Sequence, residues 1–156
     1  MDMKKFYDNI DLDLMLKAGK HLSFPMLAMI MIIEVALGPR TLLMKGQAGQ
    51  PIVPGNGILA GCPAAVSCAR CFLFAINFTL LKEHPRATIR QFVDDLRIRV
   101  TDEDPHRASI LAARALHRLL KLLSAAKCQL ALTKCVILSS HAIAGRMLRR
   151  HFGVLG

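Results

Sequence analysis

Apolar residues recur along this chain with two different periods, and each period predicts one kind of secondary structure. Long apolar stretches with helical spacing or capping residues predict helices, whereas a period of two predicts strands. The predicted helices cover residues 8–20, 24–37 and 64–82, a fourth that follows Asp104-Pro105, and a fifth from Ser140 to Gly153. Strands are predicted over residues 40–45 and 129–138 and in a hairpin within residues 87–100, with a turn at 46–50 and an irregular segment at 51–56.

The predicted hairpin is the most informative of these elements. Apolar residues at 96, 98 and 100 alternate with arginines at 97 and 99, and Asp94 and Asp95 fall at the predicted tip. Adjacent carboxylates repel each other unless a cation shares them. Two aspartates on a tight turn therefore suit a divalent cation with oxygen ligands, above all Mg²⁺. Asp-Asp is also good turn chemistry, so the hairpin by itself leaves a purely structural role open.

Residues 22–37 form a very apolar stretch that is only 16 residues long and contains Pro25 and Glu34. A helix that spans a membrane needs about 20 consecutive apolar residues. We therefore expect a buried helix that begins near Pro25, with Ser23 as a candidate cap. A membrane anchor is the alternative.

The composition places the chain among small basic globular proteins. Its 156 residues are enough for one domain with a hydrophobic core, and 53% of them are apolar. Lysine and arginine number 21 against 11 aspartate and glutamate, which gives a formal net charge of +10. This excess favours a polyanionic partner, either nucleic acid or an anionic membrane surface. The alternative is a basic protein that binds nothing specific.

The five cysteines are odd in number and irregular in spacing, and no signal peptide opens the chain. We therefore expect a reducing intracellular location, either nuclear or cytoplasmic. Cys68 and Cys71 form a C-x-x-C pair, but Cys128 and Cys135 are too far apart to supply the second pair that a zinc site would need. We expect Cys68 and Cys71 to be small buried hydrophobic residues on one helix.

Four short motifs stand in order along the chain. The first combines acidic, apolar and aromatic residues, and it is matched by Asp2, Met3, Phe6, Tyr7 and Asp8. The second is a glycine-rich turn before a helix, matched by Gly57 and Gly61. The third is aromatic-x-Asp-Asp, matched by Phe92, Asp94 and Asp95. The fourth is a lysine among apolar residues after a long helix, matched by Lys134. In this order and spacing they resemble the palm of RNA-directed DNA polymerases of the non-LTR retroelement and group II intron type, over nearly the whole chain.

The resemblance implies an α+β fold, namely a helix-rich, polymerase palm-like antiparallel sheet with packed helices. It implies a single palm-like domain over residues 1–156 that lacks most of the fingers and the thumb, and we expect such a chain to be nearly inactive alone. The implied activity is that of a reverse transcriptase, which transfers deoxynucleotides to a primer 3′-hydroxyl by a two-metal mechanism. The implied partners are an RNA or DNA template with a primer and deoxynucleoside triphosphates, and no membrane.

The resemblance also assigns catalytic roles to individual residues. Asp2 and Asp94 would be the principal ligands of two Mg²⁺ ions, which Mn²⁺ could replace, and Asp95 would support them. Lys134 would neutralise or protonate the leaving pyrophosphate. The alternative for Lys134, which we favour over this role, is a solvated lysine on a strand.

Three further residues are assigned to substrate binding by the same resemblance. Tyr7 would lie under the incoming sugar and exclude a 2′-hydroxyl, and Gly57 and Gly61 would form the turn of the second motif. Without the family, Tyr7 is equally well a core aromatic residue.

One departure from the family pattern keeps other functions open. Ala60 stands where the family usually has glutamine, so a side chain expected to position the template or the incoming base is missing. A catalytically inactive, nucleic-acid-binding remnant of a retroelement is therefore the alternative. A remote alternative is a dinucleotide-binding domain, because residues 55–60 fit G-x-G-x-x-A. The prolines at 51 and 54 argue against the strand that such a turn should follow.

Overall fold

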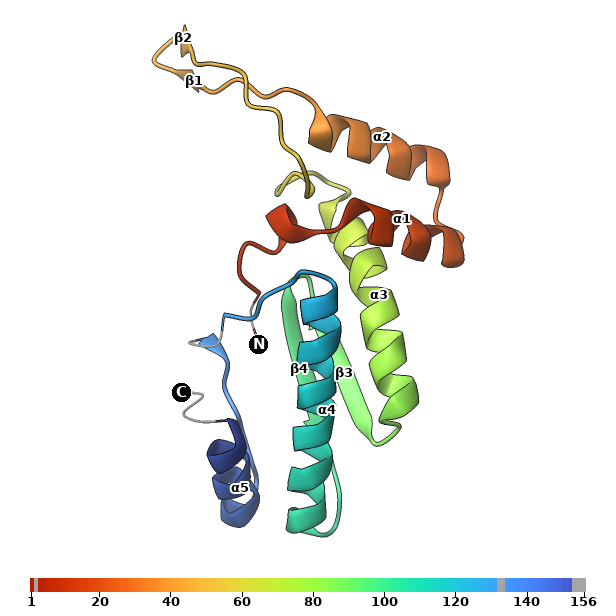
Figure 1. Ribbon diagram of the computed structural model, residues 1–156, viewed down its shortest axis with the longest axis vertical. Coiled ribbons are helices and arrows are strands. Elements are labelled where there is room, and N and C mark those ends of the chain that lie inside the picture. The colour runs from red at the N-terminus through yellow and green to blue at the C-terminus, as the bar shows by residue number, and fades with distance from the viewer. Residues whose placement is uncertain (2, 132–133, 153–156) are drawn as a thin grey trace. The chain divides into compact units, whose positions relative to one another are not determined.

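The computed structural model describes Met1, residues 3–131 and residues 134–152 (Figure 1). Contacts divide the chain into two compact units. Unit 1 contains Met1–Phe6 and Leu73–Gly156, and unit 2 contains Tyr7–Phe72. The single palm-like domain over residues 1–156 stays a prediction.

Unit 2 is built mainly from helices. Its elements are the 3₁₀ helix η1 (Tyr7–Asn9), the helices α1 (Leu12–His21) and α2 (Met26–Leu37), the strands β1 (Leu43–Met44) and β2 (Gln47–Ala48), and the first part of α3 (Ala65–Glu83). Helix α1 packs against α2. A Cβ atom on Gly19 would lie 2.5 Å from the Cε atom of Met29, so the absence of a side chain at Gly19 allows this close approach.

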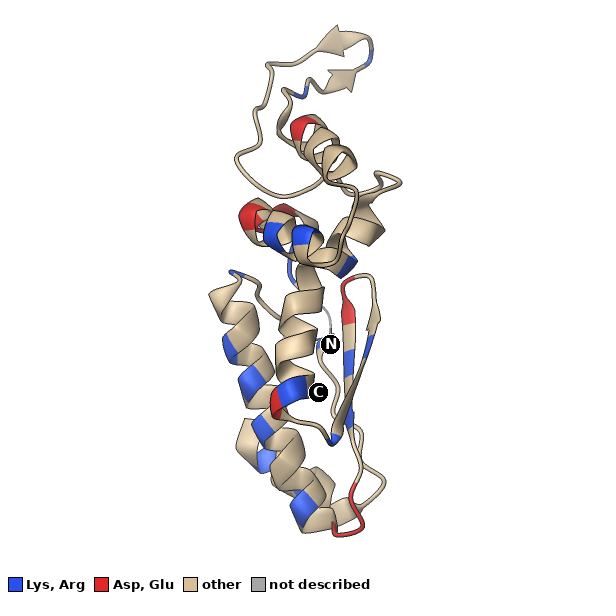
Figure 2. Cartoon of the chain, turned by 90° about the vertical axis from the view of Figure 1, so that its right-hand side faces the viewer, with Lys and Arg blue, Asp and Glu red and all other residues tan. Residues whose placement is uncertain are grey.

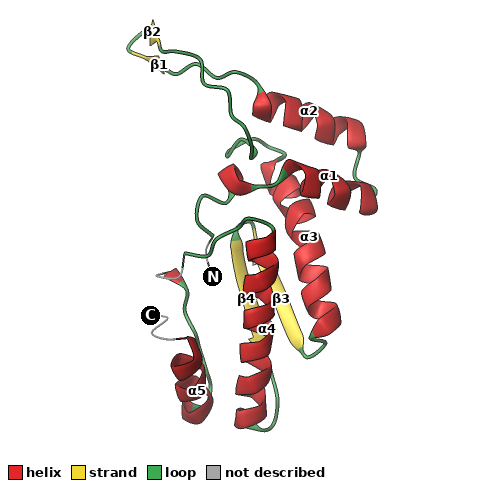
Figure 3. Cartoon of the chain, viewed as in Figure 1, coloured by secondary structure: helices red, strands yellow, loops and turns green. Residues whose placement is uncertain are grey.

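Unit 1 combines one hairpin with helices. Its elements are the rest of α3, the strands β3 (Ala87–Phe92) and β4 (Asp95–Val100), and the helices α4 (Pro105–Ala125) and α5 (Ala142–Phe152). Helix α4 packs against β4 and α5. Both small sheets, β1–β2 and β3–β4, are antiparallel, and helices dominate the described chain (Figure 3). The predicted α+β class is confirmed.

The core of unit 1 is made by leucines from a helix, a strand and a second helix. Leu80 of α3, Leu96 of β4, and Leu119 and Leu123 of α4 are all fully buried. Burial of each such side chain contributes about 1.5–3 kcal/mol to folding. Arg118 on α4 also donates two hydrogen bonds, at 2.6 and 2.7 Å, to the carboxylate of Glu83 at the end of α3.

Two aspartates determine where helices begin. The side chain of Asp11 accepts a hydrogen bond from the N–H of Leu14 at 3.0 Å, so α1 begins at Leu12 rather than at residue 8 as predicted. A 3₁₀ turn occupies the preceding residues. Asp104 accepts from the N–H of His106 at 2.9 Å and Pro105 opens α4, which confirms the predicted cap.

Helix α2 differs from its prediction in two ways. Ser23 is not its cap: Ser23 has a φ of +55°, and Pro25 stands at the N-cap position without a side-chain hydrogen bond. The helix is also largely exposed instead of buried, with 74% of Leu27 and 64% of Val35 accessible. Of its residues, only Met29, Ile33 and Ala36 are buried, because within unit 2 it packs on α1 along one side.

Helix α3 matches its prediction to within one residue at each end. It is the one helix, in the described part of the chain, that is long and apolar enough to cross a membrane by length and composition. Many of its side chains are buried within the protein, as in a core helix. Cys68 and Cys71 are among them and carry free thiols, as predicted.

Three other predicted elements need correction. The strand over residues 40–45 is only Leu43–Met44, and the predicted turn at 46–50 contains the partner strand β2, because the chain reverses tightly at Lys45 and Gly46. Ser140 does not cap the last helix. The cap is His141, whose Nδ1 atom accepts from the N–H of Ile143 at 3.3 Å.

The strand predicted over residues 129–138 is wrong wherever the structure describes it. One isolated bridge pairs Leu130 with Met3. The N–H of Lys134 then donates to the carbonyl of Ala131 at 2.8 Å. This local hydrogen bond belongs to a turn and not to a β-ladder.

Candidate functional site

The β3–β4 hairpin presents the two predicted aspartates at its tip. The strands pair without a bulge from Ala87 opposite Val100 to Phe92 opposite Asp95, which leaves Val93 and Asp94 as a two-residue loop. This is the hairpin that the period of two predicts.

The loop is strained at Val93. Its φ is +55°, whereas Asp94 is not in this left-handed region. A positive φ at the first of two loop residues alone is the type II′ pattern, in which glycine is preferred. A β-branched residue there costs on the order of 1–3 kcal/mol, and such strain persists where the surrounding structure imposes it.

The carboxylates at the tip are available for a ligand. Asp94 is half-buried and Asp95 is exposed, and neither side chain has a hydrogen bond or ion pair with any residue that the structure describes. Oxygen donors of this kind fit Mg²⁺. Within the described ranges no three acidic, histidine or cysteine side chains are grouped to hold a metal, so the tip supplies only part of a ligand set.

Asp2, the third predicted ligand, lies outside the described residues. Its neighbour Met1 is described and pairs with β4 directly after the tip. The terminal ammonium of Met1 donates to the carbonyl of Leu96, and the N–H of Leu96 donates to the carbonyl of Met1, both at 2.9 Å. The convergence of Asp2 with Asp94 and Asp95 stays a prediction.

One face of the hairpin is basic and exposed. Arg90, Arg97 and Arg99 share this face with Phe92 and Asp95, and Arg90 lies directly opposite Arg97. None of the three arginines forms an ion pair within the described part of the chain. Figure 2 shows the acidic tip and the basic residues farther along the strands. Phe92 is 77% exposed, so its ring stands free beside the carboxylates.

Gln91 and Asn77 are connected to the hairpin tip by side-chain hydrogen bonds, and the sequence analysis identified neither residue. The side-chain amide of Gln91 donates to the carbonyl of Val93 at 3.1 Å, and that of Asn77 on α3 donates to Gln91 at 3.1 Å. The sequence offered one signal for Gln91. It is polar, although it lies on the face of β3 that also carries the apolar residues Ala87 and Ile89.

In unit 2 the predicted substrate-binding residues lie on η1 and on the segment between β2 and α3. Gly57, with a φ of +85°, packs so closely on η1 that a Cβ atom would stand 2.5 Å from the carbonyl oxygen of Tyr7. The N–H of Ile58 donates to the same oxygen at 2.9 Å. Gly61, also at +85°, is the third residue of a turn closed by a hydrogen bond from Cys62 to Leu59. A positive φ at this position is typical of a type II turn, which favours glycine there. The structure thus brings Gly57 and Tyr7 together.

Lys134 is exposed and is not on a strand, so the structural context predicted for it is absent from the described chain. Its proposed role at the leaving pyrophosphate stays a prediction.

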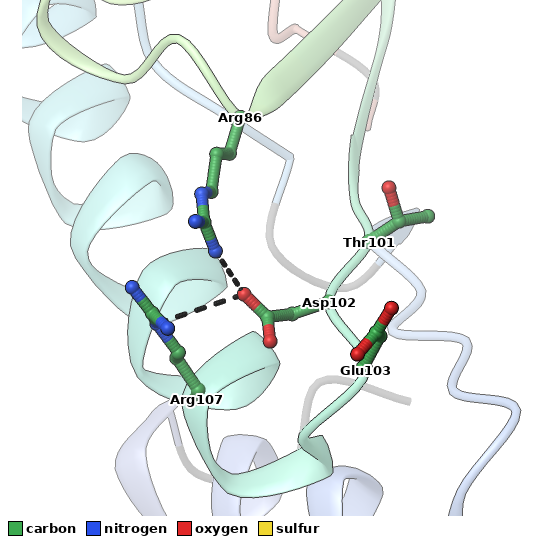
Figure 4. Close-up of a pocket in the computed structure, with 5 residues that line it drawn as sticks. All are labelled: Arg86, Thr101, Asp102, Glu103 and Arg107. Atoms are coloured by element: carbon green, nitrogen blue, oxygen red, sulfur yellow. Dashed lines mark hydrogen bonds and ion pairs between the residues drawn. The ribbon is translucent and has the colours of Figure 1, made fainter.

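A polar hollow of about 460 Å³ lies elsewhere in unit 1, lined by Arg86, Thr101, Asp102, Glu103 and Arg107 (Figure 4). The carboxylate of Asp102 pairs with Arg86, lies 3.7 Å from Arg107 and accepts from the N–H of Asp104 at 3.2 Å. These contacts join the ends of the hairpin to the start of α4, and the two arginines are matched by two carboxylates. The hollow is therefore a structural junction.

Comparison with known proteins identifies a family. The family described as reverse transcriptase (RNA-dependent DNA polymerase) matches residues 1–154. A search of curated proteins and a search of solved structures found no match. Since the family match covers nearly the whole chain, including the hairpin of unit 1, the chain belongs to the reverse transcriptase (RNA-dependent DNA polymerase) family.

Proposed function

We propose that this protein catalyses RNA-directed DNA synthesis, with Asp94 and Asp95 holding divalent cations at the tip of the β3–β4 hairpin. The observation that carries the proposal is a pair of carboxylates at the hairpin tip that have no partner among the described residues. Asp94 lies on the strained two-residue loop and Asp95 at the start of β4. Asp2 is proposed as the third ligand, supported by the pairing of its neighbour Met1 with Leu96. The order of the motifs favours a polymerase of the non-LTR retroelement or group II intron type.

The roles of the residues follow from what the reaction needs. Two Mg²⁺ ions, or Mn²⁺ in their place, would stabilise the attacking 3′-oxygen and the leaving oxygen. Asp94 and Asp95 would fix the cations through their carboxylate oxygens. Lys134 is proposed to neutralise the leaving pyrophosphate, and Tyr7 to contact the sugar of the incoming nucleotide, with Gly57 and Gly61 shaping the turns of the second motif.

The basic face of the hairpin is proposed to bind the nucleic acid. Arg90 and Arg97 lie directly opposite each other, and like charges in that position destabilise a sheet. A phosphate backbone would relieve this repulsion, and the exposed ring of Phe92 offers a surface on which a base can stack. The template is proposed to be RNA or DNA, and the location to be intracellular, which agrees with five free thiols.

Primer extension tests the proposal. The protein is mixed with a labelled primer on an RNA template, deoxynucleoside triphosphates and Mg²⁺ or Mn²⁺. Since the chain is expected to be nearly inactive alone, we expect only weak extension by the parent protein. We expect none by Asp94→Asn, which keeps the shape of the side chain and removes its charge. The control is Asp13→Asn, the same change at an exposed position of α1. Extension that survives Asp94→Asn would contradict the proposed mechanism.

The second candidate function is nucleic-acid binding without catalysis. Ala60, which replaces the glutamine of the second motif, is the observation that favours it. Salt-sensitive binding of primer–template by a protein that extends no primer with either cation would support this function over the first.

A further inference from the structure

A chain of two side-chain hydrogen bonds connects helix α3 to the loop that carries Asp94. The amide nitrogen of Asn77 donates to the amide oxygen of Gln91, and the amide nitrogen of Gln91 donates to the carbonyl oxygen of Val93, each at 3.1 Å. All these residues belong to unit 1.

The direction of this chain is determined by its last member. A backbone carbonyl can only accept, so Gln91 must turn its nitrogen toward Val93 and its oxygen toward α3. Asn77 must then be the donor. The same geometry leaves the Oδ1 atom of Asn77 buried without a partner within the described structure.

This arrangement is unfavourable for stability taken alone. A buried acceptor without a donor costs about 1–3 kcal/mol. The buried residues of α3, the helix that carries Asn77, are mainly apolar. An apolar side chain would avoid that cost. What Asn77 does provide is the correct orientation of Gln91, which in turn holds the strained residue Val93 at a positive φ.

We propose that Asn77 and Gln91 are positioning residues, which hold the carbonyl of Val93 and thereby set the direction of the Asp94 carboxylate for its cation. The inference rests on the metal role proposed for Asp94 above. It assigns no contact with substrate or cation to Asn77 or Gln91. They act through the backbone of the loop.

The test uses Asn77→Leu and Gln91→Glu. Leucine removes the donor and the unpartnered oxygen together, and an ionised glutamate cannot donate to Val93. The two readouts are the carbonyl ¹³C chemical shift of Val93 without metal and the affinity for Mn²⁺ measured by electron paramagnetic resonance. The control for the added charge is Gln50→Glu, at an exposed position of unit 2.

In both variants we expect the Val93 carbonyl signal to shift. We also expect Mn²⁺ affinity to fall by about 10-fold, the lower end of the loss that is typical when residues that orient metal ligands are changed. In Asn77→Leu we also expect thermal stability to be unchanged or higher. A merely structural role predicts lower stability with unchanged affinity, so this result separates the two roles.

Three results would overturn the inference. An unmoved Val93 carbonyl in both variants would show that the hydrogen bonds do not hold the loop. A moved carbonyl with Mn²⁺ affinity within twofold of the parent would show that the loop does not position the ligand. Lower stability of Asn77→Leu with unchanged affinity would assign Asn77 a structural role. If the parent and Asp94→Asn bind Mn²⁺ equally, the metal role proposed for Asp94 is wrong. The chemical shift of the Val93 carbonyl then still tests whether the two hydrogen bonds hold the loop.

Discussion

At the scale of one residue, Val93 lowers the stability of the protein while it fixes the geometry of the hairpin loop. A β-branched side chain at a φ of +55° is costly, and glycine would occupy the same backbone position without strain. The hydrogen bond from Gln91 maintains the conformation. The strain lies directly beside Asp94, where the proposed function requires a precise carboxylate direction.

Replacing Val93 by glycine should therefore stabilise the protein. Relief of about 1–3 kcal/mol of strain exceeds the roughly 0.5–1 kcal/mol that glycine costs through the flexibility of the unfolded chain. We expect a net gain of about 1 kcal/mol in the free energy of unfolding, measured by urea denaturation.

The control for this prediction is Val100→Gly in β4, where the backbone is ordinary extended strand. That change should lower the free energy of unfolding. If Val93→Gly lowers it equally, the loop is not strained in solution.

At the scale of elements, acidic and basic side chains occupy separate parts of the hairpin. Arg90, Arg97 and Arg99 lie along the strands, whereas Asp94 and Asp95 lie at the tip. This separation suits a polymer whose phosphates contact the strands while its reacting end meets the carboxylates.

Arg97→Gln should have two effects of opposite sign. It removes one of the proposed phosphate contacts, so the slope of the logarithm of primer–template affinity against the logarithm of salt concentration should become shallower by about 1. It also removes the repulsion with Arg90, so the free energy of unfolding should rise by about 0.2–1 kcal/mol. Fluorescence anisotropy and urea denaturation measure the two effects.

Arg118→Gln is the matched change, because Arg118 is already paired with Glu83. We expect it to leave the salt slope unchanged. Equal slopes for the parent protein and Arg97→Gln would remove the hairpin face from the nucleic-acid contact.

The sequence predicts the hairpin well and other elements less well, for physical reasons. Alternation at residues 96–100 is a local signal, and local pairing of β3 with β4 satisfies it. Among the described residues, the apolar run at 129–138 has no such partner beyond the bridge of Leu130 to Met3, and a local turn at Lys134 replaces the strand there. The exposure of α2 depends on which elements pack against it, and the spacing of apolar residues along the chain does not contain that information. Asn77 belongs to no motif, and only its contact with Gln91 reveals it.

At the scale of the whole molecule, buried thiols link folding to pH. Burial raises the pKa of Cys128 in unit 1 from 9.0 to about 11. Burial also raises the pKa of Cys68 in unit 2 to about 11, and the neighbouring Cys71 and Cys62 add to the effect. The folded protein therefore keeps protons that the unfolded chain loses.

The free energy of unfolding should consequently decrease as pH rises from 9 to 11. Below pH 9 both states hold the thiol protons, so the full stability is present there. Urea denaturation under reducing conditions measures the effect. The double variant Cys68→Ala and Cys128→Ala should show a shallower decrease, and an identical decrease would show that these thiols do not titrate as described.

The central claim is that the tip of the β3–β4 hairpin holds the divalent cation of a reverse transcriptase, and cleavage by bound iron tests it most directly. Fe²⁺ replaces Mg²⁺, and ascorbate with peroxide then generates radicals that cut the backbone beside the ion. We predict cuts close to Asp94 and Asp95 that excess Mg²⁺ suppresses, that Asp94→Asn abolishes and that Asp13→Asn retains. Cuts confined to other segments, or an unchanged pattern in Asp94→Asn, would contradict the account.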